Sequence, residues 1–418
     1  MIAAEPIGRP LLFFTGFCIC LAMLLGGATT QGQWTDYVLY IAFAPFTLIG
    51  LGRINESRLS GLGKIVVALI LAILALQFLP IAHPVNPFQN STSPDLGAPI
   101  KPLAEIISGG QFWSPALGRS LESALFTVSL LGFALFVARL NDFDQSRLVR
   151  FFVVGTFLNV VIAFIQTSYN RFDSSSLFFP YKVSVGIFAN ENHFSSLIYC
   201  GIILTGFQFI FLNRQKFLYF LSVLLFVFIL FAYNSRAGMI IAVLTAIPVY
   251  LVFAKHQGAR WRIIFAEAVF IAIPFVLLFY RIGAVEDTTR DGLNAVTLQS
   301  ILHFLPFGSG LGSFIHVYPM FDQASAIGSS FVNHAHNDWF ELTLELGVAF
   351  PVIAVLLLTV LIRSNWRDGL SGLAILILFA LSLHSLVDYP LRTMGIGIVF
   401  AYALGITVCK TDYLLIKN

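Results

Sequence analysis

The densest group of residues able to do chemistry is the segment 334–347, HAHNDWFELTLELG. If a helix begins near residue 337, then His334, Asp338, Glu341 and Glu345 recur at spacings of three and four and share one face. Such a face can bind a divalent metal, although no His-Glu-x-x-His spacing is present. The residues fit a proton-transfer centre better, with His336 as general base and a nearby carboxylate that orients its imidazole.

A second patch, NSRAG at 234–238, places Arg236 at the start of a long apolar run. An arginine at the end of an apolar helix needs an anionic partner or a route to water. The free N–H groups of a helix N-terminus also favour phosphate. Arg236 is therefore a candidate phosphate ligand, and the alternative is an arginine that extends to lipid head groups. Arg290 is a second isolated cation that can converge with Arg236 on one polyanion.

Three further patches are polar or rich in glycine. In FANENH (188–193), Asn190 can cap the apolar helix that follows, yet Asn192 and His193 add more polarity than a cap requires. PFGSGLGSF (306–314) resembles a phosphate-cradling loop, but without a strand-turn-helix unit around it we favour a tight turn. In HSLVDYPLR (384–392), His384 and Asp388 lie four residues apart, which structural hydrogen bonding explains equally well.

The elements that carry these patches belong to a membrane protein. Hydrophobic residues make up 58% of the 418, charged residues only 11%, and the mean hydropathy is +0.86, whereas soluble domains carry about 25% charged residues. This composition excludes a cytosolic enzyme, a nucleic-acid binder and a secreted disulfide scaffold. The four cysteines fall in apolar runs without disulfide or metal spacing.

The fold class predicted is all-α, a single polytopic membrane domain over 1–418 with about twelve transmembrane helices. The apolar runs lie at 11–28, 36–52, 64–82, 120–140, 149–167, 193–213, 217–234, 237–254, 263–280, 348–363, 369–387 and 394–410. Two connections are too long to be turns, a Pro- and Ser-rich loop at 83–119 and a large loop at 281–347 between helices 9 and 10. Long loops of ordinary complexity tend to carry function.

Charge sets the orientation. With both termini cytoplasmic, every inner connection carries at least two Lys or Arg, as the positive-inside rule requires. The outer face then keeps Lys101, Arg119, Arg171, Lys182, Arg236, Arg281, Arg290 and Arg392. All histidines except His256 lie at or near that face, and histidine is the side chain best suited to proton transfer near neutral pH. The candidate site is therefore expected at the outer face of the membrane.

The order of the patches resembles the superfamily of O-antigen polymerases and O-antigen ligases, bacterial envelope glycosyltransferases. The matching pieces are Asn-x-Asn-His-Phe (190–194), Ser-Arg-x-Gly (235–238), the isolated Arg290, Pro-x-Gly-x-Gly-x-Gly-x-Phe (306–314), His-x-His-Asn with Glu-x-x-x-Glu-x-Gly (334–347), and His-Ser-Leu-Val-Asp (384–388). They cover about half of the chain, and the first five predicted helices match only in hydropathy.

The resemblance implies a multi-pass protein of the bacterial inner membrane with a periplasmic active site. Its donor is a glycan linked through diphosphate to a polyprenol, its acceptor is a glycan or the lipid-A core, and a chain-length regulator is a possible partner; it requires no cofactor and no metal. By this resemblance the catalytic residues are His336, Arg236 and Arg290. The substrate-binding residues predicted are Arg236, Arg290, His334, Asn337, Glu345, His193 and Asn192.

The chain departs from the family near Phe350, where a second glycine is common, and the 281–347 loop is short for the protein oligosaccharyltransferases of the superfamily. These features favour a polymerase or ligase, and HxHN with VDYPLR looks more like a polymerase. The rival is a twelve-span carrier or lipid-linked glycan flippase. A carrier predicts ionisable residues in mid-span, for which Glu267 and Glu122 are the candidates, and repeated halves, which the sequence lacks.

Overall fold

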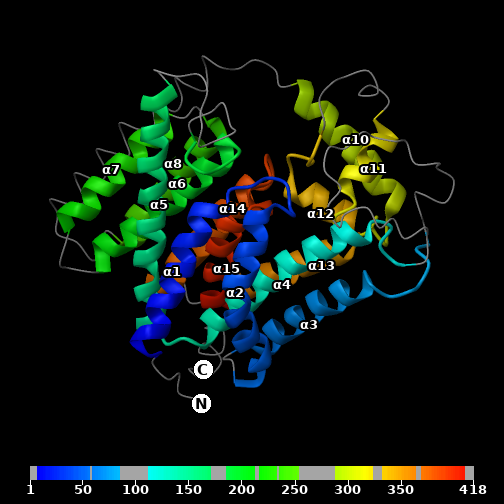
Figure 1. Cartoon of the computed structure of the whole chain (residues 1–418), viewed down its shortest axis with the longest axis horizontal. Helices are drawn as coiled ribbons and strands as arrows, with labels where there is room; N and C mark the ends of the chain where they lie inside the picture. The colour runs from blue at the N-terminus through cyan, green and yellow to red at the C-terminus, as the bar shows by residue number, and fades with distance from the viewer. Residues whose placement is uncertain are drawn as a thin grey trace.

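The computed structural model describes residues 7–56, 59–84, 112–170, 185–211, 216–232, 235–253, 288–322, 332–363 and 369–409. Within these ranges the chain is helical (Figure 1). The α-helices are α1 (Arg9–Leu25), α2 (Trp34–Gly52), α3 (Gly61–Leu76), α4 (Leu117–Arg139), α5 (Asp142–Asn170), α6 (Glu191–Phe211), α7 (Lys216–Ala232), α8 (Arg236–Phe253), α10 (Thr288–Phe304), α11 (Phe314–Phe321), α12 (Asp338–Leu346), α13 (Ala349–Arg363), α14 (Gly369–His384) and α15 (Met394–Cys409). Short 3₁₀ turns are η1 (Ile54–Glu56) and η5 (Pro390–Arg392).

Every predicted span coincides with a helix except 263–280, which lies outside the described residues together with Glu267. Three helices, α2, α4 and α5, are long and apolar enough to cross a membrane. Others, such as the 17 residues of α1, are apolar but shorter; at 1.5 Å per residue a helix of this length reaches about 25 Å, less than a bilayer core of about 30 Å. The structure thus confirms the all-helical fold and apolar helices of membrane type, and the full number of twelve spans stays a prediction.

Polar side chains fix where several helices begin. Gln33 precedes α2, and its backbone N–H donates to the Asp36 carboxylate at 3.1 Å in a reciprocal capping box. The Ser60 hydroxyl accepts from the Gly63 N–H at the start of α3. At the start of α6, the Asn190 side chain accepts from the Asn192 N–H at 2.8 Å, so the predicted capping role of Asn190 is confirmed.

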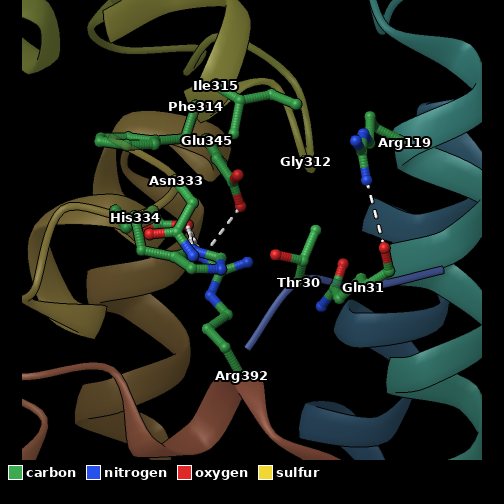
Figure 2. A pocket seen from close by; sticks show the side chains of 11 residues that line it. Thr30, Gln31, Arg119, Gly312, Phe314, Ile315, Asn333, His334, Glu345 and Arg392 are labelled. Carbon is green, nitrogen blue, oxygen red and sulfur yellow. Dashed lines mark hydrogen bonds and ion pairs between the residues drawn. The ribbon is translucent and has the colours of Figure 1, made fainter. Parts of the chain in front are cut away.

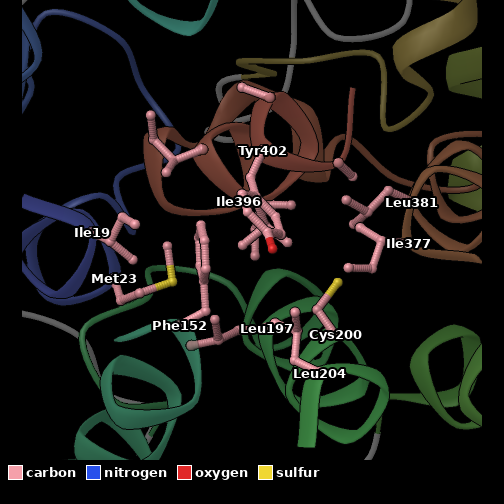
Figure 3. Close-up of a cluster of buried hydrophobic side chains, with 14 of the residues drawn as sticks. Ile19, Met23, Phe152, Leu197, Cys200, Leu204, Ile377, Leu381, Ile396 and Tyr402 are labelled. Atoms are coloured by element: carbon pink, nitrogen blue, oxygen red, sulfur yellow. The ribbon is translucent and has the colours of Figure 1, made fainter. Parts of the chain in front are cut away.

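The core lies where α1, α5, α6, α14 and α15 pack together (Figure 3). Met23, Phe152, Leu197, Ile377 and Tyr402 meet there from these five helices. The Tyr402 hydroxyl donates to the Gln145 carbonyl at 2.9 Å, which satisfies the polar end of an otherwise apolar contact. Large apolar side chains also cover outward faces: Phe17, Ile41, Phe164 and Val355 are each more than 60% exposed. Such a surface fits a lipid environment.

Helices α10, α11 and α12 form a small unit with its own apolar core, and α10 and α11 lie at one edge of the molecule (Figure 1). Phe304, Phe314, Val317 and Leu344 make its apolar core. This unit occupies the described part of the predicted 281–347 loop, which is therefore largely helical. Of the predicted 83–119 loop, residues 85–111 lie outside the described residues.

Helix α2 packs closely on α4 through glycine. A Cβ on Gly50 would meet the carbonyl of Gly132, whereas a Cβ on Gly52, two residues later on the same helix, would have no heavy atom within 4 Å. Small residues at such positions let two backbones approach.

We expect Gly50→Ala to lower stability by about 1–3 kcal/mol, because the added methyl group must push α2 away from α4. Gly52→Ala is the matched control and should be neutral or slightly stabilising, since alanine favours the helix. Thermal unfolding of the detergent-solubilised protein measures both. Equal melting temperatures for the two variants would show that this contact is not tight.

Candidate functional site

A buried carboxylate, Asp388, lies at the centre of the predicted site. Its Oδ1 is 3.3 Å from the His336 Nδ1 and 3.7 Å from the His193 Nε2. The Asn192 side-chain amide donates to the other carboxylate oxygen. Burial opposes ionisation of Asp388, but His193 and His336 outweigh it and hold its pKa well below the usual range. Asp388 is therefore a carboxylate that two imidazoles and an amide share.

The end of α14 explains how Asp388 reaches this position. The chain turns after His384, and the Asp388 N–H donates to the His384 carbonyl at 3.0 Å. The His384 Nδ1 lies 2.8 Å from the Ser196 hydroxyl and 3.2 Å from the Tyr199 hydroxyl. The four-residue spacing of His384 and Asp388 thus produces a turn, in which His384 ties α14 to α6 and Asp388 faces the site.

His336 has the geometry of a general base. Its backbone φ is +50°, a left-handed conformation that is uncommon outside glycine and often occurs at functional sites. Its side chain is 31% exposed, while the Asp388 beside it is fully buried. A proton on the Nδ1, toward the carboxylate, leaves the Nε2 lone pair free to accept another.

Tyr389 packs against three histidines. Its ring centroid lies 4.6 Å from that of His193, 4.5 Å from that of His334 and 4.8 Å from that of His336. Burial, with a further contribution from Asp388, raises the Tyr389 pKa to about 12, so the phenol keeps its proton. Its hydroxyl interacts with Asn190 and Asn333. Tyr389 thereby packs against His193, His334 and His336 together.

A second cluster surrounds Arg392 in η5. Its guanidinium lies 3.1 Å from Glu345, 3.3 Å from Glu341 and 3.6 Å from Asp338, and all four side chains are buried. Burial opposes the charge of Arg392, but the three carboxylates raise its pKa above the usual value. This cation is permanently charged and is shared among three acids.

Arg392 does not affect the pKa values of the three acids equally. Burial alone would raise the Glu341 pKa, yet Arg392 and His334 lower it to about 2. Burial raises the Asp338 pKa to about 7 despite Arg392, and it also raises that of Glu345. Glu341 is therefore ionised, and Asp338 is the acid that holds a proton as pH falls toward neutrality.

Hydrogen bonds of backbone groups connect the Asp388 centre with the Arg392 cluster. The Asp338 N–H donates to the carbonyls of Ser385 at 2.9 Å and Asp388 at 3.2 Å, and the Leu391 N–H donates to the Asp338 carboxylate at 3.2 Å. The His334 Nδ1 is 2.8 Å from the Glu341 carboxylate, which also accepts from the Ala335 N–H. The segment 334–338 is therefore fixed at both ends, with His336 between.

A small pocket of about 40 Å³ opens beside Arg392 (Figure 2). Figure 2 shows Thr30 and Gln31 on one side, Asn333 and His334 on the other, and the Arg392 guanidinium between them. Arg119 closes the pocket from α4. Its guanidinium donates to the Gln31 carbonyl at 3.2 Å and to Glu122 at 3.1 Å.

The glycine segment is the tight turn predicted. Gly308, Gly310 and Gly312 all have positive φ. The Ser309 N–H donates to the Leu344 carbonyl at 2.7 Å and the Gly310 N–H to the Glu345 carbonyl at 3.0 Å. These N–H groups, which a phosphate loop would offer to its ligand, instead bind the end of α12.

The structure places most of the other predicted site residues. Arg236 begins α8 and is exposed; the adjacent Ser235 hydroxyl donates to the Asn192 side chain at 2.9 Å, which joins α8 to the Asp388 centre. Arg290 lies in α10, but its side chain is outside the described residues, so convergence with Arg236 stays a prediction. The Asn337 side chain caps α12 by accepting from the Phe340 N–H at 3.1 Å.

One expectation about the acidic face was wrong. α12 begins at Asp338, so His334 lies before the helix and reaches Glu341 from a turn instead of sharing a helical face. The spacing of Asp338, Glu341 and Glu345 did bring three acids together. Arg392 occupies the face that was considered for a metal, and within the described ranges no group of His, Cys, Asp or Glu side chains has the arrangement of a metal site.

Sequence reasoning missed Arg392 as the organising residue and Asp388 as the partner of His336. Both lie in HSLVDYPLR, where the sequence indicates only the four-residue spacing of His384 and Asp388 and the outer position of Arg392. The available signal was an arginine in the short link before an apolar run. Comparison with protein-family models gave no match, and neither did comparison with curated proteins.

We expect Asp338→Asn to gain stability over the parent protein as pH rises from about 4 to about 7. The folded-state pKa of Asp338 is about 7 against 3.8 for the free group, so its ionisation costs folding energy across this window, and asparagine avoids the cost. The pKa difference corresponds to about 4 kcal/mol at full ionisation. Melting temperatures at pH 5 and pH 8 measure the effect, with the exposed Asp142→Asn as control. A stability difference that does not change with pH would contradict the assignment.

Proposed function

We propose that the protein transfers a polyprenyl-diphosphate-linked glycan to an acceptor hydroxyl at the periplasmic face of the bacterial inner membrane, as an O-antigen or exopolysaccharide polymerase or an O-antigen ligase. The supporting observation is the partly exposed His336 imidazole, whose Nδ1 lies 3.3 Å from the buried Asp388 carboxylate. This pair has the arrangement of a general base with an orienting acid. Twelve spans and cytoplasmic termini belong to the same proposal.

The proposed reaction is a displacement at the anomeric carbon. The His336 Nε2 takes the proton of the acceptor hydroxyl as its oxygen forms a bond to that carbon. The bond from the carbon to the diphosphate oxygen breaks, and polyprenyl diphosphate leaves with the electron pair. The configuration inverts. Arg236 and Arg290 would stabilise the negative charge that grows on the diphosphate.

The position of the charged groups favours transfer over a carrier. In the described part of the chain, His336, Asp388 and Arg392 lie beyond or at helix ends, whereas a carrier needs ionisable groups in mid-span. Glu122, one of two candidates for a carrier, is paired with Arg119 at 3.1 Å near the start of α4. The other candidate, Glu267, lies outside the described residues.

We expect His336→Ala to reduce transfer by about 10²–10⁴-fold, because the base is lost. Arg236→Ala and Arg290→Ala should also abolish long chains, and Arg236→Lys should be damaging because a point charge cannot replace a bidentate fork. Gels of envelope polysaccharide from a complemented deletion strain measure this. Arg363→Ala, at the exposed end of α13, is the control.

The same gel separates the two enzyme types. Loss of long chains with one capped repeat remaining indicates a polymerase, and loss of all attached chains with accumulation of lipid-linked polymer indicates a ligase. Unchanged polysaccharide in the His336→Ala, Arg236→Ala and Arg290→Ala strains would refute the proposed site.

A further inference from the structure

The pocket beside Arg392 has no part in the transfer step described above. Its outer wall comes from the α1–α2 connection, through Thr30 and Gln31, and from Arg119 at the start of α4. These elements lie in the half of the chain that shows no motif. Its inner wall comes from His334 and Arg392 of the candidate site and from the apolar side chains of Phe314 and Ile315 at the start of α11.

The outer wall is held in place by hydrogen bonds. The Thr29 carbonyl lies 2.7 Å from the His334 Nε2, which joins the connection to the segment that carries His336. The Gln31 carbonyl accepts from Arg119 at 3.2 Å, and its side-chain oxygen accepts from the Ser123 hydroxyl at 2.6 Å. No hydrogen bond of the Thr30 hydroxyl is found among the described residues, and Figure 2 shows this side chain directed toward Arg392.

The charges of the pocket disfavour an anion. Arg392 is shared by three carboxylates, two of which, Glu341 and Glu345, line the pocket with side chains about 1% exposed. Arg119 is already paired with Glu122. A phosphate or an acidic sugar placed here would lie against carboxylates without a free cation to balance it. A neutral hydroxyl can both donate to the acids and accept from the guanidinium groups.

Size restricts the ligand further. A volume of about 40 Å³ leaves room for a few water-sized groups. A hydroxyl or hydroxymethyl substituent of a sugar fits this space. The pocket is one aromatic ring from the proposed base, since Tyr389 packs on both His334 and His336.

The pocket and the proposed diphosphate ligand Arg236 are reached from different helices. Arg236 joins the Asp388 centre through Ser235 and Asn192, from the side of α6 and α8. Arg119 of α4 lines the pocket. Helix α4 packs on α15, whereas α14 packs on α6 and α8. An in-line displacement requires the leaving group and the acceptor on opposite sides of the anomeric carbon.

We propose that this pocket binds a neutral hydroxyl-bearing substituent of the acceptor glycan and excludes acidic sugars, so that Thr30, Gln31 and Arg119 determine acceptor specificity. The term acceptor rests on the proposed function, whereas sugar binding by the pocket does not.

Saturation-transfer NMR on the full chain in phospholipid nanodiscs tests the pocket, because sugar-based detergents would compete. The probes are the methyl glycosides of glucose, galactose, mannose and rhamnose, with methyl glucuronide as the acidic comparison. We expect at least one neutral glycoside to bind and the glucuronide to bind more weakly. Thr30→Val should weaken neutral binding by about three- to tenfold, the effect of one hydrogen bond.

Two controls accompany this variant. Thr359→Val makes the same substitution on the exposed face of α13, where the hydroxyl donates only to the Val355 carbonyl within its own helix, and should bind like the parent. His336→Ala should retain glycoside binding while it loses transfer.

The results that contradict the two proposals differ. The proposed sugar site is refuted by any of three results: tighter binding of the glucuronide, no binding of any neutral glycoside, or equal affinity in Thr30→Val and Thr359→Val. If glycoside binding depends on Thr30 but His336→Ala leaves the envelope polysaccharide unchanged, the sugar site stands and its assignment to an acceptor falls.

Discussion

Arg392 is a buried cation against which three buried acids of α12 are packed, and the position of the candidate site depends on this interaction. Removing one partner from a buried ion pair costs about 3–5 kcal/mol, because the remaining charge loses its compensation. The cluster at Arg392 holds more negative than positive charge when all three acids are ionised, since Glu341, Glu345 and Asp338 surround one guanidinium. Protonation of Asp338 near neutral pH relieves the excess negative charge.

The Arg392 cluster connects parts of the chain that are distant in sequence. Glu341 holds His334 and the Ala335 N–H, and Asp338 accepts from Ser385 and Leu391. The turn of 334–338 is therefore held against the end of α14, where Asp388 lies. A left-handed backbone at His336 is maintained because both flanks are fixed. The charged network supplies rigidity, and the Asp388 centre supplies the chemistry that we propose.

Hydropathy was sufficient to predict the all-helical fold, because an apolar run of membrane length has few other solutions. Helical spacing also predicted that Asp338, Glu341 and Glu345 would share a face, and glycine spacing predicted the turn at 308–312. The partners of these residues were not predictable in the same way. Arg392 and Asp388 meet α12 across 47 and more positions of sequence, and periodicity carries no information about such long-range pairing. The contribution of Thr30 and Arg119 to the pocket was hidden for the same reason.

Reconstitution tests the proposed reaction most directly. The purified chain in liposomes would receive membrane-extracted polyprenyl-diphosphate-linked glycan and acceptor, without nucleotide sugar, and the release of polyprenyl diphosphate would be measured together with glycan transfer. The account predicts equal amounts of both products, and their loss in His336→Ala and Asp388→Asn. Movement of the intact lipid-linked glycan across the bilayer without cleavage, unchanged in these variants, would contradict it and identify a carrier.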